Sequence, residues 1–85
     1  MINFNTVLNK TINNLKFRRV YEPKLNLIVY RLENLKILLE DEEPIKQNPI
    51  RGITRAYLDI FSDYDNPILK DLYFLEKEVE KKVKG

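Results

Sequence analysis

The side chains that most often carry out chemistry in proteins are nearly absent from this sequence of 85 residues. It contains no cysteine, no histidine and a single serine, Ser62, and its two glycines, Gly52 and Gly85, form no phosphate-binding loop. Zinc sites, Ser-His and Cys-His nucleophiles and the usual acid–base group near neutral pH all need residues that are missing here. We therefore expect no enzymatic activity, no catalytic residues, no bound metal and no cofactor.

One segment combines bases with aromatic rings, as a surface that binds nucleic acid does, with charges for the phosphates and rings for stacking. The bases that would serve this role are Lys16, Arg18, Arg19, Lys24 and Arg31. A second interpretation is a solvated helix end, because cations near the C-terminus of a helix are favoured by the helix dipole. The pI of 8.9 falls short of a strongly basic footprint. Nucleic-acid binding is therefore the alternative function and not the first.

Residues 23–40 carry more large apolar side chains than one helical stripe can hold. The main stripe consists of Leu25, Ile28, Val29, Leu32, Leu35 and Leu39. A second group gathers on the other side of the same helix and consists of Leu27, Tyr30, Ile37 and Leu38. A helix that is apolar on two faces is buried on two faces. Two alternatives stay open: a central helix of the fold, or a second stripe that packs against another copy of the chain or a target.

A further set of candidate interface residues lies within residues 67–83. Phe74 projects from this helix roughly opposite its apolar stripe, and Tyr73 and Leu69 flank the core side. Aromatic residues on an exposed helical face are common anchors of protein interfaces. The alternative for Phe74 is a cover supplied by the N-terminal segment of the same chain.

Apolar residues recur at spacings of three and four in four segments, which predicts amphipathic helices over residues 5–20, 23–40, 49–62 and 67–83. Two starts are marked by Asn48-Pro49-Ile50 and Asn66-Pro67-Ile68, because Asn is a preferred N-cap and Pro suits the first helical position. We predict an all-α fold, a small antiparallel four-helix bundle with short loops, as a single helical domain over residues 1–85.

A β-hairpin near residues 16–32 is the variant of this fold that stays open. Residues 16–21 and 25–30 are rich in β-branched and aromatic side chains on either side of Glu22-Pro23. Such runs around a proline-containing turn are typical of two paired strands. The helical spacing of the same residues favours the bundle over the hairpin.

Charge and hydropathy restrict the environment of the protein. The net charge is +2, with an excess of bases in residues 1–40 and an excess of acids in residues 41–85. The longest apolar run, residues 27–30, is too short to cross a bilayer, and the first residues lack the basic and apolar regions of a signal peptide. We therefore expect a cytoplasmic protein without a membrane span. The nine asparagines are typical of AT-rich coding sequences, as in low-GC bacteria and mobile elements.

These observations favour a small protein-protein interaction protein of the inhibitor, adaptor or immunity type, which acts by binding the surface of a partner. The expected partner is another protein of unknown identity, and a homodimer is a second form of the same prediction. In size, four-helix plan and basic character the chain is loosely similar to the bacteriocin immunity proteins, a similarity of format that no motif carries. The alternative is a small nucleic-acid-binding regulator that uses the basic first half of the chain.

Overall fold

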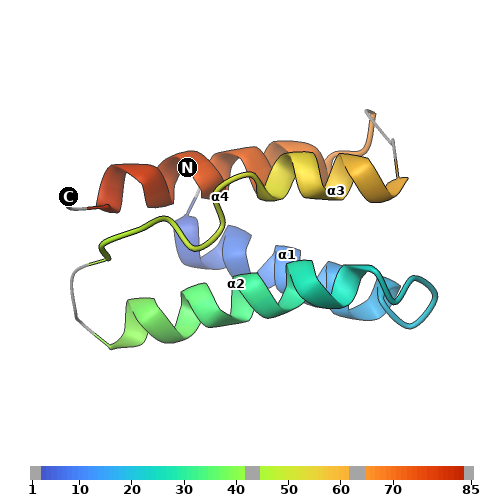
Figure 1. The fold of residues 1–85 in the computed structure, drawn as a ribbon, viewed down its shortest axis with the longest axis horizontal. Coiled ribbons are helices and arrows are strands. Elements are labelled where there is room, and N and C mark those ends of the chain that lie inside the picture. The colour runs from blue at the N-terminus through green and yellow to red at the C-terminus, as the bar shows by residue number, and fades with distance from the viewer. Residues whose placement is uncertain (1–2, 42–44, 62–64, 84–85) are drawn as a thin grey trace.

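The computed structural model describes residues 3–41, 45–61 and 65–83, and helices account for most of them. The four helices are α1 (Phe4–Arg18), α2 (Leu25–Glu40), α3 (Ile53–Phe61) and α4 (Ile68–Lys82). Consecutive helices run in opposite directions, with α1 and α2 in one layer and α3 and α4 in the other (Figure 1). The predicted all-α, antiparallel four-helix bundle is therefore confirmed.

The hairpin alternative near residues 16–32 is wrong. The N–H groups of Tyr21 and Glu22 both donate to the Arg18 carbonyl, at 3.0 and 3.1 Å, and this tight turn leads from α1 into α2. Leu25 and Ile28, on the far side of the turn, lie on the stripe of α2 that is buried in the core. Strand propensity depends strongly on context, so burial of a helical stripe outweighs the β-branched and aromatic composition.

The core lies between the two layers, and each helix packs against two neighbours. α1 contacts α2 and α4, while α3 contacts α4 and α2. Tyr57 of α3 is the largest fully buried side chain in the described residues. The fully buried leucines of the core come from the other three helices: Leu8, Leu15, Leu25, Leu32, Leu35, Leu72 and Leu75. Burial of this shared stripe holds the bundle together.

Residues 45–52 lead into α3, which lies in the other layer from α2 (Figure 1). In this segment Ile45 and Ile50 are buried, and Ile45 forms an isolated parallel bridge with Val83 at the end of α4. The helix predicted to start at Pro49 begins instead at Ile53, which corrects its boundary. Gly52 has φ +79°, a left-handed conformation that interrupts a helix. The start predicted at Asn66-Pro67 is confirmed, since α4 begins at Ile68.

A group of polar contacts joins residues 45–52 to α4. The Asn48 side-chain amide donates to the Glu76 carbonyl at 3.1 Å and to Glu80 Oε2 at 2.8 Å. Arg51 donates from Nη2 to the other Glu80 oxygen, Oε1, at 2.7 Å. These hydrogen bonds, first from Asn48 and then from Arg51, stabilise the charged form of Glu80 and lower the pKa of that carboxyl below its ordinary value of 4.5.

Candidate protein-binding surface

α2 turns an apolar face away from the core. The large side chains on this side are Leu27 (67% exposed), Tyr30 (68%), Ile37 (63%) and Leu38 (37%). We call these four residues the outer face of α2. The interpretation of α2 as a central helix buried on two faces is wrong for the described part of the chain. Its neighbours α1 and α3 cover only the opposite stripe, which leaves the outer face open to solvent.

The outer face of α2 borders a groove of about 510 Å³. The residues that line this groove are Arg19, Asn26, Tyr30, Glu33, Asn34 and Ile37. Tyr30 and Ile37 supply its apolar surface, and Asn34 stands between them on the helix. Asn34 was not predicted as part of the surface, because the spacing of apolar side chains gives no signal for a polar residue between them. The combination of a ring, an aliphatic chain and polar edges is typical of a site that holds a side chain of another protein.

Of the three interface residues predicted on α4, one is exposed and two are partly buried against the core. Tyr73 is 53% exposed, and the ammonium group of Lys77 lies 5.3 Å from the centre of its ring. Leu69 is partly buried and packs against the core. Phe74 is also partly buried, with its ring centre 6.5 Å from that of Phe4 on α1. The alternative in which the N-terminal segment covers Phe74 is therefore the one found in the structure.

The structure does not bring the two groups of predicted interface residues together. The outer face of α2 and Tyr73 of α4 belong to different layers, and α2 and α4 are not among the helix pairs in contact (Figure 1). Of the seven predicted residues, four are exposed on one side of α2, with Asn34 between Tyr30 and Ile37, and on α4 only the ring of Tyr73 is well exposed.

The bases predicted to bind nucleic acid do not form one surface, because two of them point inward. Arg18 donates from Nη1 to the hydroxyl of buried Tyr57 at 2.8 Å, and its guanidinium carbon lies 4.6 Å from the centre of the Phe61 ring. Arg31 donates to the backbone carbonyls of Pro49 and Arg51, at 3.1 and 2.7 Å. Both arginines hold the fold together through contacts distant in the sequence.

The other three bases differ in how they are engaged. Lys16 forms an ion pair with Glu33 of α2 at 3.5 Å. Arg19 lines the groove beside the outer face of α2, and Lys24, at the start of α2, is exposed. Arg19 and Lys24 are therefore the two members of the set best placed for a charged partner.

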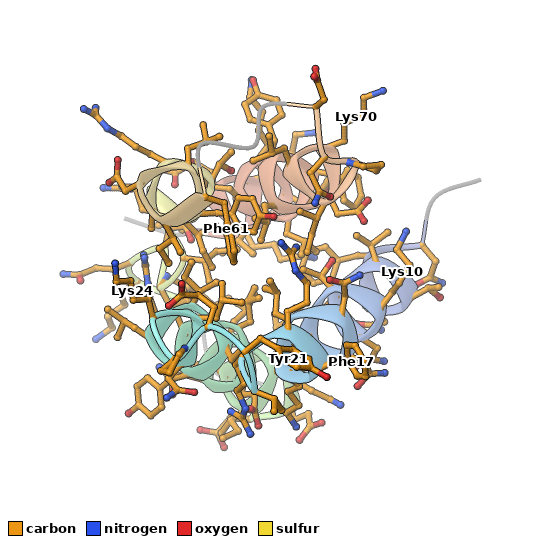
Figure 2. The ribbon with its side chains drawn as sticks, turned by 90° about the vertical axis from the view of Figure 1, so that its right-hand side faces the viewer. Lys10, Phe17, Tyr21, Lys24, Phe61 and Lys70 are labelled. Carbon is orange, nitrogen blue, oxygen red and sulfur yellow. The ribbon has the colours of Figure 1, made fainter. Side chains whose placement is uncertain are left out.

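An exposed cluster of large side chains lies at the end of α1 and in the turn that follows it. Phe17 and Tyr21 lie side by side there, with ring centres 6.2 Å apart in an edge-to-face arrangement (Figure 2). Val20, between them in sequence, is exposed as well. The exposure of Phe17 could be predicted from the sequence, because Phe17 lies off the buried stripe of α1.

The described residues contain no group of three or more metal-ligating carboxylates, which leaves them without a candidate metal centre. None of the helices within residues 3–41, 45–61 and 65–83 combines the length and the apolar character that crossing a bilayer requires.

Comparison with known proteins places the chain in a family. Residues 3–84 match the sequence profile of the family described as YeeD uncharacterised protein. The chain belongs to this family. No curated protein and no solved structure shows significant similarity to it.

Proposed function

We propose that this member of the YeeD family is a non-enzymatic binding protein, which acts by docking the outer face of α2 onto the surface of a partner protein. The observation that carries the proposal is the exposure of Leu27, Tyr30, Ile37 and Leu38 along one side of a single helix. Several large apolar side chains exposed on one side of a helix are a feature of surfaces at which proteins associate. Tyr30, with its large apolar ring and polar tip, is the best anchor among them.

The composition supports the same proposal. Inhibitors, adaptors and immunity proteins act by occupying a surface and need no reactive side chain, and this chain has no cysteine or histidine. A cytoplasmic location is part of the proposal, because small proteins of oxidising compartments commonly rely on disulfides that this chain cannot form.

The internal contacts of the bases favour protein binding over nucleic-acid binding. Arg18 and Arg31 already donate hydrogen bonds within the chain, and Lys16 has an acidic partner in Glu33. To bind phosphates, three of the five bases would have to give up these contacts within the chain. We therefore expect no salt-sensitive mobility shift with unrelated duplex DNA at low salt, which is where phosphate contacts are strongest.

The test is affinity capture with matched variants in the native host. The tagged wild-type chain is compared with Leu27→Asp and Tyr30→Asp, which place a charge on the outer face of α2. Asn13→Asp, at an exposed position on α1, is the control for the added charge. We expect the same protein to co-purify with the wild type and with Asn13→Asp and to be lost from both outer-face variants. Circular dichroism of each variant verifies that the helices are intact.

Retention of every captured protein by Leu27→Asp and Tyr30→Asp, with helical content unchanged, would contradict the proposal. A charge in a desolvated apolar contact is strongly unfavourable unless it is paired. An interface centred on these residues could therefore not survive either substitution.

A further inference from the structure

We infer that the end of α1 and the turn that follows it bind the surface of an anionic lipid bilayer, with apolar side chains inserted at the level of the headgroups. The residues involved are not those of the outer face of α2, so the inference does not rest on the proposed function. Three observations carry it: a compact group of exposed apolar side chains, its place at a projecting end of the bundle, and the bases around it.

The exposed group consists of Phe17, Val20 and Tyr21, which we call the apolar tip. Their exposed fractions are 71%, 76% and 79%, the three highest values among the large apolar residues in the described part of the chain. All three fall within one stretch of five residues. Contact of such side chains with water is unfavourable and is relieved when they enter an apolar medium.

The apolar tip lies at a projecting end of the bundle. The turn between α1 and α2 extends beyond the end of α3 along the long axis of the molecule (Figure 1). Figure 2 looks onto this end and shows Phe17 and Tyr21 on the side of α1, away from Phe61 and Lys70 of the other layer. A projecting end does not enclose the side chain of a partner, but it can enter a deformable surface such as the headgroup region of a bilayer.

Bases surround the apolar tip. Residues 16–24 contain four bases and one acid. Lys24 is exposed, and the partly buried Arg19 borders the groove beside α2. Bases this close to a bilayer that contains anionic lipids are attracted by its negative surface potential, which is a property of the cytoplasmic leaflet. Charge and apolar insertion therefore favour the same surface.

The acids near the apolar tip weaken this attraction without reversing it. Glu33 is paired with Lys16, so their charges offset each other. Glu22 accepts the N–H of the residue two positions later at 3.1 Å, which holds its carboxylate beside the start of α2. Asp59 lies on α3 and Asp65 precedes α4, so both belong to the other layer of the bundle. Around the tip itself, bases outnumber acids.

The geometry of the apolar tip favours a bilayer over single-stranded nucleic acid. The bases of a nucleic acid stack on open faces of aromatic rings. Here Phe17 and Tyr21 meet edge to face, so one ring covers part of a face of the other. Val20 adds apolar surface but no ring on which a base could stack. Arg18 lies in the same segment but donates to Tyr57 inside the bundle.

The first measurement is co-sedimentation of the full-length chain with two kinds of vesicle. One contains phosphatidylcholine alone, and the other contains phosphatidylcholine and phosphatidylglycerol in equal parts. We expect binding to the anionic vesicles and its release at about 1 M salt, where the Debye length is only about 3 Å. Binding to neither kind of vesicle, or equal binding to both, would overturn the inference.

Ring-removing variants test the apolar tip. Phe17→Ser and Tyr21→Ser should each weaken binding to the anionic vesicles about tenfold, because each removes an inserted ring. Tyr73→Ser removes an exposed ring from α4, in the other layer, and is the matched control that should not change binding. Circular dichroism verifies that the helices are intact. Unchanged binding in both tip variants would refute the assignment.

Charge variants test the bases and the acid separately. Lys24→Gln should weaken binding about fivefold, because one base near an anionic surface is lost. Glu22→Gln should strengthen it, since the negative charge is removed while a side-chain oxygen remains that can accept the same N–H. Lys70→Gln, at an exposed position of α4, is the control for a lost base (Figure 2). An equal loss in Lys24→Gln and Lys70→Gln would show that binding follows net charge and not the tip.

A tryptophan at the tip reports insertion directly, because the chain contains no tryptophan of its own. The fluorescence of Phe17→Trp should shift to shorter wavelength with the anionic vesicles, as the indole leaves water. Tyr73→Trp should show no shift. An unshifted spectrum of Phe17→Trp on vesicles that bind the chain would place the contact elsewhere and refute the inference.

The outcomes separate this inference from its alternatives. A chain that ignores vesicles but binds a single-stranded oligothymidylate, with binding lost in Phe17→Ser, would replace the bilayer by nucleic acid. Capture of a partner protein through Leu27 and Tyr30 should be the same in Phe17→Ser as in the wild type. Failure to bind vesicles would therefore overturn only this inference, and failure to capture a partner would overturn only the proposed function.

Discussion

The guanidinium of Arg18 donates a hydrogen bond to the hydroxyl of Tyr57 at 2.8 Å, across 39 residues of sequence. Tyr57 is fully buried, and the same hydroxyl accepts a bond from the Asn66 side chain at 3.3 Å. The Arg18 guanidinium carbon lies 4.6 Å from the centre of the Phe61 ring. Figure 2 shows Phe61 between the two layers of the bundle. The Tyr57 hydroxyl of α3 therefore joins the end of α1 to the segment that leads into α4.

Replacement of Arg18 should destabilise the fold and leave the outer face of α2 unaffected. We expect Arg18→Ala to lower the free energy of unfolding by about 2 kcal/mol, because a charge-assisted hydrogen bond and a cation–π contact are lost together. Tyr57→Phe should cost about 1 kcal/mol, since it leaves the donors of Arg18 and Asn66 without this acceptor. Urea denaturation measures both values. Arg19→Ala is the neighbouring control, and an equal loss in that variant would contradict the assignment.

How far the sequence predicts this fold is clearest at its two Asn-Pro-Ile segments. In both, the Asn side chain accepts a hydrogen bond from the N–H two residues later, at 3.0 Å. After Asn66, α4 begins two residues later, at Ile68. After Asn48 the chain makes a turn, and α3 begins only at Ile53. Each Asn side chain thus closes a tight turn, but the helix N-cap predicted at Asn48 is wrong, and the structure places the N-cap of α4 at Pro67, one residue after Asn66. The later start of α3 was not predicted, because it depends on the left-handed conformation of Gly52 and on the burial of Ile50 in the core.

The delayed start of α3 predicts a specific cost for a side chain at Gly52. Its φ of +79° is strained for any residue with a Cβ atom, although a Cβ placed there would have no other atom within 4 Å. We expect Gly52→Ala to lower the free energy of unfolding by about 1 kcal/mol through backbone strain alone. Gly52→Asn should cost less, because asparagine tolerates the left-handed region better. Equal stability of Gly52→Ala and the wild type in urea denaturation would refute this account.

The candidate sites show a different limit of sequence reasoning. Spacing alone predicted the second apolar stripe of α2, because helical geometry decides which residues share a face. It could not predict that Arg31 would be held by the carbonyls of Pro49 and Arg51, nor that Phe4 would cover Phe74. These contacts join segments far apart in sequence, and their partners are fixed only by the packing of the whole bundle.

Phe74 should contribute to stability and not to partner binding. We expect Phe74→Ala and Phe4→Ala each to lower the free energy of unfolding by about 2 kcal/mol, less than a fully buried phenylalanine would. The double variant should lose less than the sum of the two, by about 1 kcal/mol, because the rings contact each other. Thermal and urea denaturation supply the cycle. Loss of partner capture by Phe74→Ala, with the helices intact, would restore this residue to the interface.

Glu80 should make the bundle sensitive to mild acid. Hydrogen bonds from Asn48 and Arg51 hold the pKa of Glu80 below its ordinary value of 4.5. As pH falls, the unfolded chain therefore takes up this proton before the folded chain does. The stabilising contribution of Glu80 is full above pH 4.5 and is lost as pH falls through the lower pKa of the folded state.

Urea denaturation between neutral pH and about pH 3 tests this linkage in the wild type and in Glu80→Gln, which keeps the shape but has no carboxyl to titrate. The difference in stability between the two should be constant above pH 4.5 and should shrink below it. Arg51→Ala removes one of the two donors and should bring the pKa of Glu80 closer to 4.5 in a carbon-13 NMR titration. A difference that stays constant down to the acid limit would show that the folded chain does not favour the charged carboxylate.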